Sequence, residues 1–199
     1  MAIELEDTPR TASTPVVKRQ KIGERFVGAV VKAEQRPQTK LVDGVRTEIK
    51  KPNGNPRQEL VVHCIVMPKN TAEVSLGDDK HLPEPGESVR LILKGKAFGD
   101  WIEARKGHRG GKLLVGDIVV QEVTHAQQYD ANGQPKGGEI VDQAVADAVP
   151  RGTSLGFYGP VTIHAHRDDE WVTKAEAAYH ALTAIEATPA QTFGDDEPF

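Results

Sequence analysis

Lysine and arginine are the residues of this 199-residue chain whose positions point most clearly to a chemistry. Residues 18–58 contain eleven of them against four acidic residues, a net charge of +7, and residues 88–112 contain seven against two, a net charge of +5. Trp101 lies between basic residues of the second block, three positions after Phe98. Cations that pair with phosphates and rings that stack on bases are what sequence-tolerant binding of a single-stranded nucleic acid needs. The two blocks therefore indicate a polyanion-binding surface.

The residues expected to contact nucleic acid come from both basic blocks. They are Arg25, Lys32, Arg36, Lys40, Arg46, Lys50, Lys51 and Arg57 in the first block, and Lys94, Lys96, Phe98, Trp101, Arg105, Lys106, Arg109 and Lys112 in the second. We expect residues 36–57 to form a long basic finger and the glycine-rich run 106–112 to form a flexible loop that follows the phosphates. The alternatives are solvated charged faces, an exposed turn at 106–112, and core positions for Trp101 and Phe98.

The C-terminal block, residues 168–199, has eight acidic residues against one lysine, a net charge of −7. Its last residues, Gly194–Phe199, end in an acidic run followed by Pro-Phe. Such an end can dock on another protein if the Phe199 ring fills an apolar pocket and the carboxylates pair with arginine or lysine of the partner. The residues expected to bind a partner are Asp195, Asp196, Glu197, Pro198 and Phe199. A tail that only improves solubility is the alternative. The charge sorting also suggests a hypothesis of self-competition, in which the tail covers the basic surface until nucleic acid displaces it.

Other chemistries fit the sequence less well. The lone cysteine, Cys64, excludes an internal disulfide and a cysteine-rich zinc site, and its apolar strand makes it an expected core residue. The glycine-rich run before Leu113 is no P-loop, because its glycines are wrongly spaced and Leu113 stands where Ser or Thr must bind magnesium. His164 and His166 would need a third metal ligand from elsewhere. With no nucleophile–base pair in view, the sequence predicts no catalytic site, metal or cofactor.

Membrane insertion is not expected from the sequence. Residues 1–17 contain no apolar stretch of the kind found in signal peptides. The longest apolar run, Leu60–Met67, is too short to span a bilayer. We therefore expect a cytoplasmic location.

The elements that must position these residues are mostly short strands, since 19 glycines and 13 prolines favour turns over long helices. The expected strands cover residues 25–32, 60–67, 87–94, 98–104 and 113–125, with a hairpin turn at Asp43–Gly44. No helix of convincing length is expected among them. An antiparallel sheet of about five strands follows, and closure into a barrel would remove its edges.

Beyond Tyr129 the sequence changes character. Residues 130–138 are expected to be a linker, 141–149 two helical turns, and 154–166 one strand or a hairpin. A helix should begin at Asp168 or Asp169. Its apolar face would contain Trp171, Ala175, Ala178, Leu182 and Ile185.

The terminal segment Gly194–Phe199 resembles the tip of the single-stranded DNA-binding proteins of bacteria and their phages, which ends in acidic residues and Pro-Phe. The segment Gly86–Gly95 is similar to a glycine-led barrel strand of that family, followed by the aromatic residues Phe98 and Trp101. The first strand lacks the family's usual signature and the sheet is poor in aromatics, so the resemblance is to a divergent, phage-like member.

This resemblance implies a five-stranded OB-fold that coats and protects single-stranded DNA in replication, recombination and repair. It also implies dimers or tetramers, and recruitment of replication and repair enzymes by the C-terminal tip. The expected layout is a flexible N-terminal arm (1–20), the OB-fold domain (21–130), a linker with a strand and helix extension (131–189), and the docking tail (190–199). Three alternatives stay open: an RNA- or duplex-binding OB protein, a scaffold without a nucleic-acid role, and a metal-dependent enzyme using His164 and His166.

Overall fold

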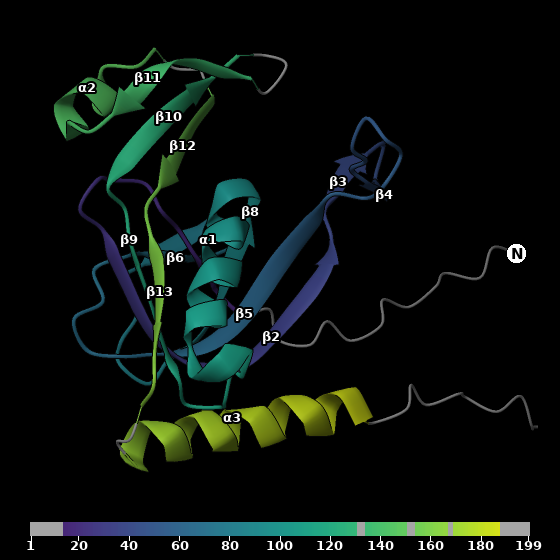
Figure 1. Cartoon of the computed structure of the whole chain (residues 1–199), viewed down its shortest axis with the longest axis vertical. Helices are drawn as coiled ribbons and strands as arrows, with labels where there is room; N and C mark the ends of the chain where they lie inside the picture. The colour runs from purple at the N-terminus through teal and green to yellow at the C-terminus, as the bar shows by residue number, and fades with distance from the viewer. Residues whose placement is uncertain (1–13, 131–133, 151–153, 167–168, 188–199) are drawn as a thin grey trace, which may run out of the picture.

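The structure is a computed structural model that describes residues 14–130, 134–150, 154–166 and 169–187. Over these residues the protein is mainly β, as predicted, with thirteen strands in three sheets (Figure 1). The α-helices are α1 (Gly95–Gly107), α2 (Gln143–Asp147) and α3 (Asp169–Ala187), and residues 109–111 form a short 3₁₀ helix. None of the helices in the described ranges is long and apolar enough to cross a membrane.

The largest sheet has eight strands in the order β13-β9-β2-β5-β8-β1-β6-β7. They are β1 (Val16–Val17), β2 (Arg25–Pro37), β5 (Gln58–Val66), β6 (Val74–Leu76), β7 (Asp79–His81), β8 (Ser88–Lys94), β9 (Ile118–Glu122) and β13 (Val161–His164). All neighbours are antiparallel except β1 and β8, which are parallel. The order β9-β2-β5-β8 is that of a Greek key, in which the fourth strand returns beside the first. Over the described residues the outer strands β13 and β7 do not pair, so the sheet is open and a closed five-stranded barrel is not confirmed.

Strand β2 begins with a run of buried residues, Phe26–Val31, because both faces of the sheet are covered there. Side chains alternate between the two faces of a strand. Phe26 and Val30 therefore join one apolar core, which packs against α1, and Val27 and Ala29 join the other, which packs against α3. Figure 1 shows α1 in the centre of the view and α3 across the bottom.

Most of the strands predicted before residue 125 are present. Residues 25–32, 60–67 and 87–94 correspond to β2, β5 and β8. The predicted hairpin turn at Asp43–Gly44 joins β3 (Thr39–Val42) to β4 (Val45–Glu48), and both turn residues have positive φ, as a two-residue turn of this kind requires. Of the strand expected over 113–125, only β9 is extended and paired as one strand.

Residues 98–104, predicted as a strand, lie within α1, so that prediction is wrong, as is the expectation of no substantial helix among the strands. Phe98, Trp101 and Ala104 all pack on the first core. Intervals of three residues keep side chains on one side of a helix, whereas a strand would turn Phe98 and Trp101 to opposite faces. Gly95, with φ of 53°, turns the chain from β8 into the helix.

A second, smaller sheet has the order β11-β10-β12. Its strands are β10 (His125–Tyr129), β11 (Pro135–Ile140) and β12 (Ser154–Tyr158). Strand β11 occupies part of the expected linker, so the linker prediction is wrong for those residues. The helical turns expected over 141–149 are present as α2, whose first turn is capped by Asp142.

Residues 154–166 are not a hairpin but two strands in different sheets. Strand β12 pairs with β10, whereas β13 pairs with β9. Gly159 and Pro160 separate them, and a Cβ at Gly159 would overlap the carbonyl oxygen of Glu122. The close approach of these two backbones is therefore possible only with glycine.

The predicted C-terminal helix is confirmed as α3, although Asp168 lies outside the described residues. Four residues of its predicted apolar face belong to the second core or pack against it: Trp171, Ala175, Ala178 and Leu182. The side chain of the fifth, Ile185, is also outside the described part. The 3.6-residue period of apolar residues predicts this helix correctly because one face of the helix is buried and the other is exposed.

Residues 14–20, expected to belong to a flexible N-terminal arm, are part of the fold. Val16 and Val17 form β1, which pairs with β8 on one side and β6 on the other. Val17 is buried in the first core. The arm prediction is therefore wrong for these residues, and residues 1–13 lie outside the described part.

Candidate nucleic-acid interface

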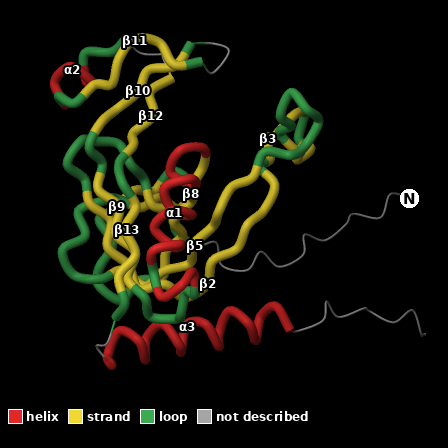
Figure 2. The backbone as a smooth tube through the Cα atoms, viewed as in Figure 1, coloured by secondary structure: helices red, strands yellow, loops and turns green. Residues whose placement is uncertain are grey.

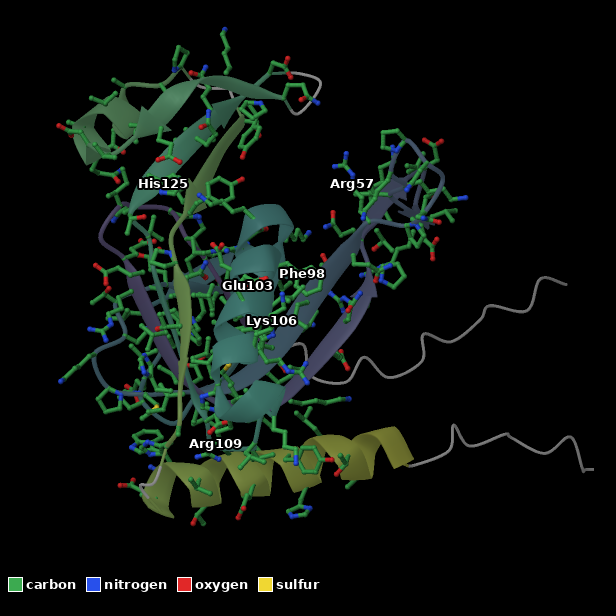
Figure 3. The ribbon with its side chains drawn as sticks, in the orientation of Figure 1. Arg57, Phe98, Glu103, Lys106, Arg109 and His125 are labelled. Atoms are coloured by element: carbon green, nitrogen blue, oxygen red, sulfur yellow. The ribbon has the colours of Figure 1, made fainter. Side chains whose placement is uncertain are left out.

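A groove of about 1070 Å³ opens where β8 ends and α1 begins. Its lining comes from β1 and the two residues after it, from β2, β5 and β8, from the base of the arm that β3 and β4 form, from the first turns of α1, and from β10 and β12 of the small sheet. Figure 3 shows Arg57 at the base of the arm and Phe98 on the neighbouring part of α1. Segments far apart in sequence thus meet at one site.

The lining of the groove is strongly cationic. It contains six basic residues, Lys18, Arg19, Lys51, Arg57, Lys94 and Lys96, and no aspartate or glutamate. Two of these cations have carboxylate partners outside the lining, since Lys94 pairs with Glu59 at 3.0 Å and Lys96 lies 4.0 Å from Glu139. This arrangement favours a ligand with repeated negative charges, such as a phosphate backbone.

Aromatic rings line the same groove. They are Phe98, Tyr129, Phe157 and Tyr158. The two tyrosine rings stand edge to face, 6.3 Å apart, and the Tyr129 hydroxyl donates to the Tyr158 hydroxyl at 2.8 Å. Each ring offers an apolar surface on which an unpaired base can stack.

Five of the residues predicted from sequence are brought together here: Lys51, Arg57, Lys94, Lys96 and Phe98. Phe98 also packs against the first core, so the interpretation of Phe98 as a core residue holds in part. The cations come from the finger block and from the end of β8. The two basic blocks therefore meet at the groove, but only some of the basic residues of each block line it.

Three predicted contacts lie on the arm or beside it. Lys40 and Arg46 are exposed on β3 and β4, and Lys50 is exposed just after the arm, where it forms a β-bridge with Pro56. None of the three lines the groove. Figure 2 shows the arm projecting away from the rest of the sheet, so these cations lie beyond the groove rather than in it.

Three further predicted contacts lie on β2, outside the groove lining. Lys32 pairs with Glu34 at 3.1 Å, and Arg36 pairs with Glu59 at 2.8 Å. Arg25 is the first residue of β2, at the opposite end from the arm. Intramolecular pairing lowers the charge that Lys32 and Arg36 offer to a ligand.

The last four predicted cations, Arg105, Lys106, Arg109 and Lys112, also lie outside the groove lining. They belong to the C-terminal end of α1 and the residues after it. Figure 3 shows Lys106 below Phe98 on α1 and Arg109 beside α3. The groove does not bring these four cations together with Lys94 and Lys96, so their contact with nucleic acid stays a prediction.

The run 106–112 is also not the flexible loop that was expected. His108 is buried and its Nε2 lies 2.9 Å from Oδ2 of Asp117, which is 2% exposed. The Arg105 side chain donates to the carbonyl oxygen of Gly111 at 2.8 Å. These bonds hold the segment against the end of α1.

Trp101 cannot act as a stacking platform in this structure. Its side chain is 1% exposed and belongs to the first core. The prediction is wrong because α1 directs the indole toward the sheet, and burial of a large apolar ring is favourable by about 2 kcal/mol or more. The core interpretation of Trp101 is the correct one.

Five groove residues were missed. Lys18 and Arg19 fall in the expected N-terminal arm, Tyr129 at the end of the expected OB-fold domain, and Phe157 and Tyr158 in the expected extension. The adjacent aromatic pair in a short β-prone run was an available signal for the last two. No local signal links Lys18 and Arg19 to this site, since their placement depends on the pairing of β1 with β8.

Glu59 forms ion pairs with two basic residues at the edge of the groove, Arg36 and Lys94. Its side chain is 6% exposed, and its oxygens lie 2.8 Å from Nε of Arg36 and 3.0 Å from Nζ of Lys94. Burial alone would raise the pKa of Glu59, but the hydrogen bonds and charges of Arg36 and Lys94 outweigh it and hold the pKa below its ordinary value. Glu59 is thus ionised at neutral pH and fixes Lys94 in the groove wall.

Glu59→Gln is expected to lower the free energy of unfolding at pH 7 by about 1.5–3 kcal/mol, because two charge-assisted bonds are weakened. A depressed folded-state pKa contributes stability above the unfolded-state pKa of about 4.3, and this is lost as pH falls through the folded value. In urea titrations the deficit of Glu59→Gln should therefore shrink as the pH is lowered below about 4.3.

Glu34→Gln is the matched control, since Glu34 pairs with Lys32 and His63 but its side chain is 37% exposed. It should cost at most about 1 kcal/mol. A Glu59→Gln deficit of the same size at pH 3 and pH 7 would contradict the ion-pair explanation.

The other candidate chemistries find no support. In the described part of the chain no group of three or more His, Cys, Asp or Glu side chains could hold a metal ion. His164 is exposed and lies by a second hollow of about 530 Å³. Cys64 is a core residue, as predicted, and burial raises the pKa of its thiol.

The partner-docking prediction falls on residues 195–199, which lie outside the described residues. The candidate interface is the groove, whose lining contains six cations, four aromatic rings and no carboxylate. Comparisons of the chain with models of known protein families, with curated proteins and with solved structures find no match.

Proposed function

We propose that the protein binds single-stranded DNA without sequence preference, and coats and protects it during replication, recombination and repair of phage or bacterial DNA. The observation that carries this proposal is the groove, which combines six cations with four aromatic rings and excludes carboxylates. Cations neutralise phosphates regardless of sequence, and every base has a face that can stack on a ring. The proposal includes no catalytic role.

We further propose that the larger sheet is a divergent OB-fold. The Greek-key order β9-β2-β5-β8, with α1 before β9 and a fifth strand β13 beside it, supports this assignment. OB-folds are partly open Greek-key barrels that bind oligonucleotides through a strand face and adjoining loops. The groove lies beside β8 and the base of an inter-strand arm, which is compatible with that mode of binding.

Single-stranded DNA is preferred over the alternatives for a physical reason. The rings can stack only on bases that are not already stacked in a duplex. The described groove residues give no basis for discrimination against RNA, so RNA binding is an outcome of the test. A scaffold without a nucleic-acid role would leave this concentration of cations without a ligand.

The full-length protein is expected to bind an oligothymidine of about 20 nucleotides, with log affinity falling linearly with log salt and a slope near −3.5 for about five neutralised phosphates. Fluorescence anisotropy between roughly 0.05 and 0.3 M salt measures this slope. Competition with RNA and duplex of the same length completes the experiment. Preferential binding to duplex, or no binding to any of the three, would contradict the proposal.

The remaining parts of the proposal concern assembly. We propose that the acidic tip, Asp195 to Phe199, recruits replication and repair enzymes, that the protein forms dimers or tetramers, and that it acts in the cytoplasm, that of the bacterial host if it is phage-encoded. The net charge of −7 over residues 168–199 and the terminal ring support a docking role for the tip.

A further inference from the structure

Arg19 lines the groove, and its guanidinium donates hydrogen bonds to two other residues of the protein. Its Nη2 donates to the carbonyl oxygen of Ile92 on β8 at 2.9 Å, and its Nη1 lies 3.5 Å from Oε1 of Gln121 on β9. Gln121 is 1% exposed and Ile92 lines the groove, so the guanidinium is held by two strands that are not neighbours in the sheet. A guanidinium has five N–H donors, and among the described residues these two bonds use two of them.

Arg19 has no counter-ion in the described part of the chain. Arg36 and Lys94, by contrast, pair with Glu59, and Arg109 pairs with Asp117. Burial lowers the pKa of Arg19 and the neighbouring Tyr158 opposes this, but an arginine stays charged in a protein. A partly buried cation without a counter-ion is costly, so the position favours an incoming anion.

Tyr158 lines the same groove as Arg19, and its hydroxyl is a second hydrogen-bond donor there. Its oxygen accepts the Tyr129 hydroxyl at 2.8 Å, and among the described residues no acceptor is found for its own O–H, which leaves that group to donate to a ligand. Burial is the largest cause that raises the pKa of Tyr158, to about 12, and this keeps the hydroxyl neutral. The ring lies over Gly156, where a Cβ would come within 2.5 Å of the hydroxyl oxygen, so the glycine permits this ring position.

We propose that Arg19 and the Tyr158 hydroxyl form a site for one internal phosphodiester of the bound strand, an inference that rests on the proposed function. The N–H groups of Arg19 that its two bonds to Ile92 and Gln121 leave over can donate to the non-bridging oxygens of a phosphodiester, and the Tyr158 hydroxyl adds a further donor. The other groove cations, Lys18, Lys94 and Lys96 among them, are left for neighbouring phosphates. The site would anchor the strand while the exposed lysines attract it.

The test compares Arg19→Gln with Lys96→Gln, which removes one groove charge from an exposed side chain, 62% accessible. With an oligothymidine that lacks terminal phosphates, Arg19→Gln should weaken binding about 10- to 100-fold at both roughly 0.05 and 0.3 M salt. Lys96→Gln should weaken it about two- to fivefold, and less at the higher salt, because exposed charges are screened. Equal losses for the two variants would overturn the inference while leaving the proposed function intact.

Tyr158→Phe tests the hydroxyl separately, because it keeps the ring. It should weaken binding about three- to tenfold, with little added loss in the Arg19→Gln background, because both groups act on the same phosphate. If Arg19→Gln fails to fold, wild-type affinity of Tyr158→Phe would overturn the inference. A deficit that appears only with a 5′- or 3′-phosphorylated oligothymidine would assign a terminal phosphate instead, and would also overturn it. Failure of the wild-type protein to bind at all would reject the proposed function itself.

Discussion

Trp101→Ala is expected to lower the free energy of unfolding by about 3–5 kcal/mol, the usual cost of removing a large buried ring. The indole is 1% exposed and shares the first core with Phe26, Leu91 and Leu93 beneath α1. The alanine would leave a cavity that the sheet cannot fill, because β2, β5 and β8 are fixed by their pairing. Urea denaturation followed by circular dichroism measures the change.

The folded fraction of Trp101→Ala should bind oligothymidine with nearly wild-type affinity, since the ring does not line the groove. Trp101→Phe is the matched control, because it keeps most of the apolar volume and should cost less than about half as much stability. Weakened DNA binding at unchanged stability would show instead that Trp101 stacks on a base.

The triple variant Lys51→Gln, Arg57→Gln, Lys96→Gln is expected to flatten the salt dependence of oligothymidine binding by about 2 log–log units, roughly 0.7 for each phosphate that is no longer neutralised. All three cations line the groove, and among the described residues only Lys96 has an ion-pair partner, Glu139 at 4.0 Å. Their replacement should also weaken binding most strongly at low salt, where the released counterions contribute most. Anisotropy titrations at several salt concentrations measure both effects.

The control is the triple variant Arg105→Gln, Lys106→Gln, Lys112→Gln, which removes the same charge from the far end of α1. These residues lie outside the groove lining, so the slope should stay within about 0.5 of the wild-type value. Long-range attraction alone would reduce affinity equally in both triples. Equal flattening of the slope in both would mean that the strand runs along the whole of α1, and would contradict the groove as the binding site.

The local pattern of the sequence predicted a large part of the fold. Alternation placed Val89, Leu91 and Leu93 on one face of a strand, and all three are fully buried on β8. The Asp43–Gly44 turn was predictable because few residue pairs accept the backbone angles it requires. The α1 segment was mistaken for a strand because a glycine lies in its middle and its apolar residues are few.

The sequence predicted the chemical character of the candidate site, basic residues beside aromatic rings, but only some of the residues that form it. Lys94, Lys96 and Phe98 could be found because they are neighbours in the chain. Phe98 and Trp101 have the same chemical character, yet one lines the groove and the other is buried one turn further along α1. The position of α1 relative to the sheet decides which ring is exposed, and this position cannot be deduced from the residue types alone.

The sequence by itself determined the mainly-β character, the strand and turn positions that depend on near neighbours, and the sorting of charge into basic blocks and an acidic end. Only the tertiary structure decided which cations share one opening, because the pairing of β1 with β8 brings Arg19 to it and the return of β12 beside β10 brings Tyr158. The physical reason is the range of the interactions. Propensity and periodicity act over a few residues, whereas a binding groove is made by strand pairing and core packing between segments about a hundred residues apart or more.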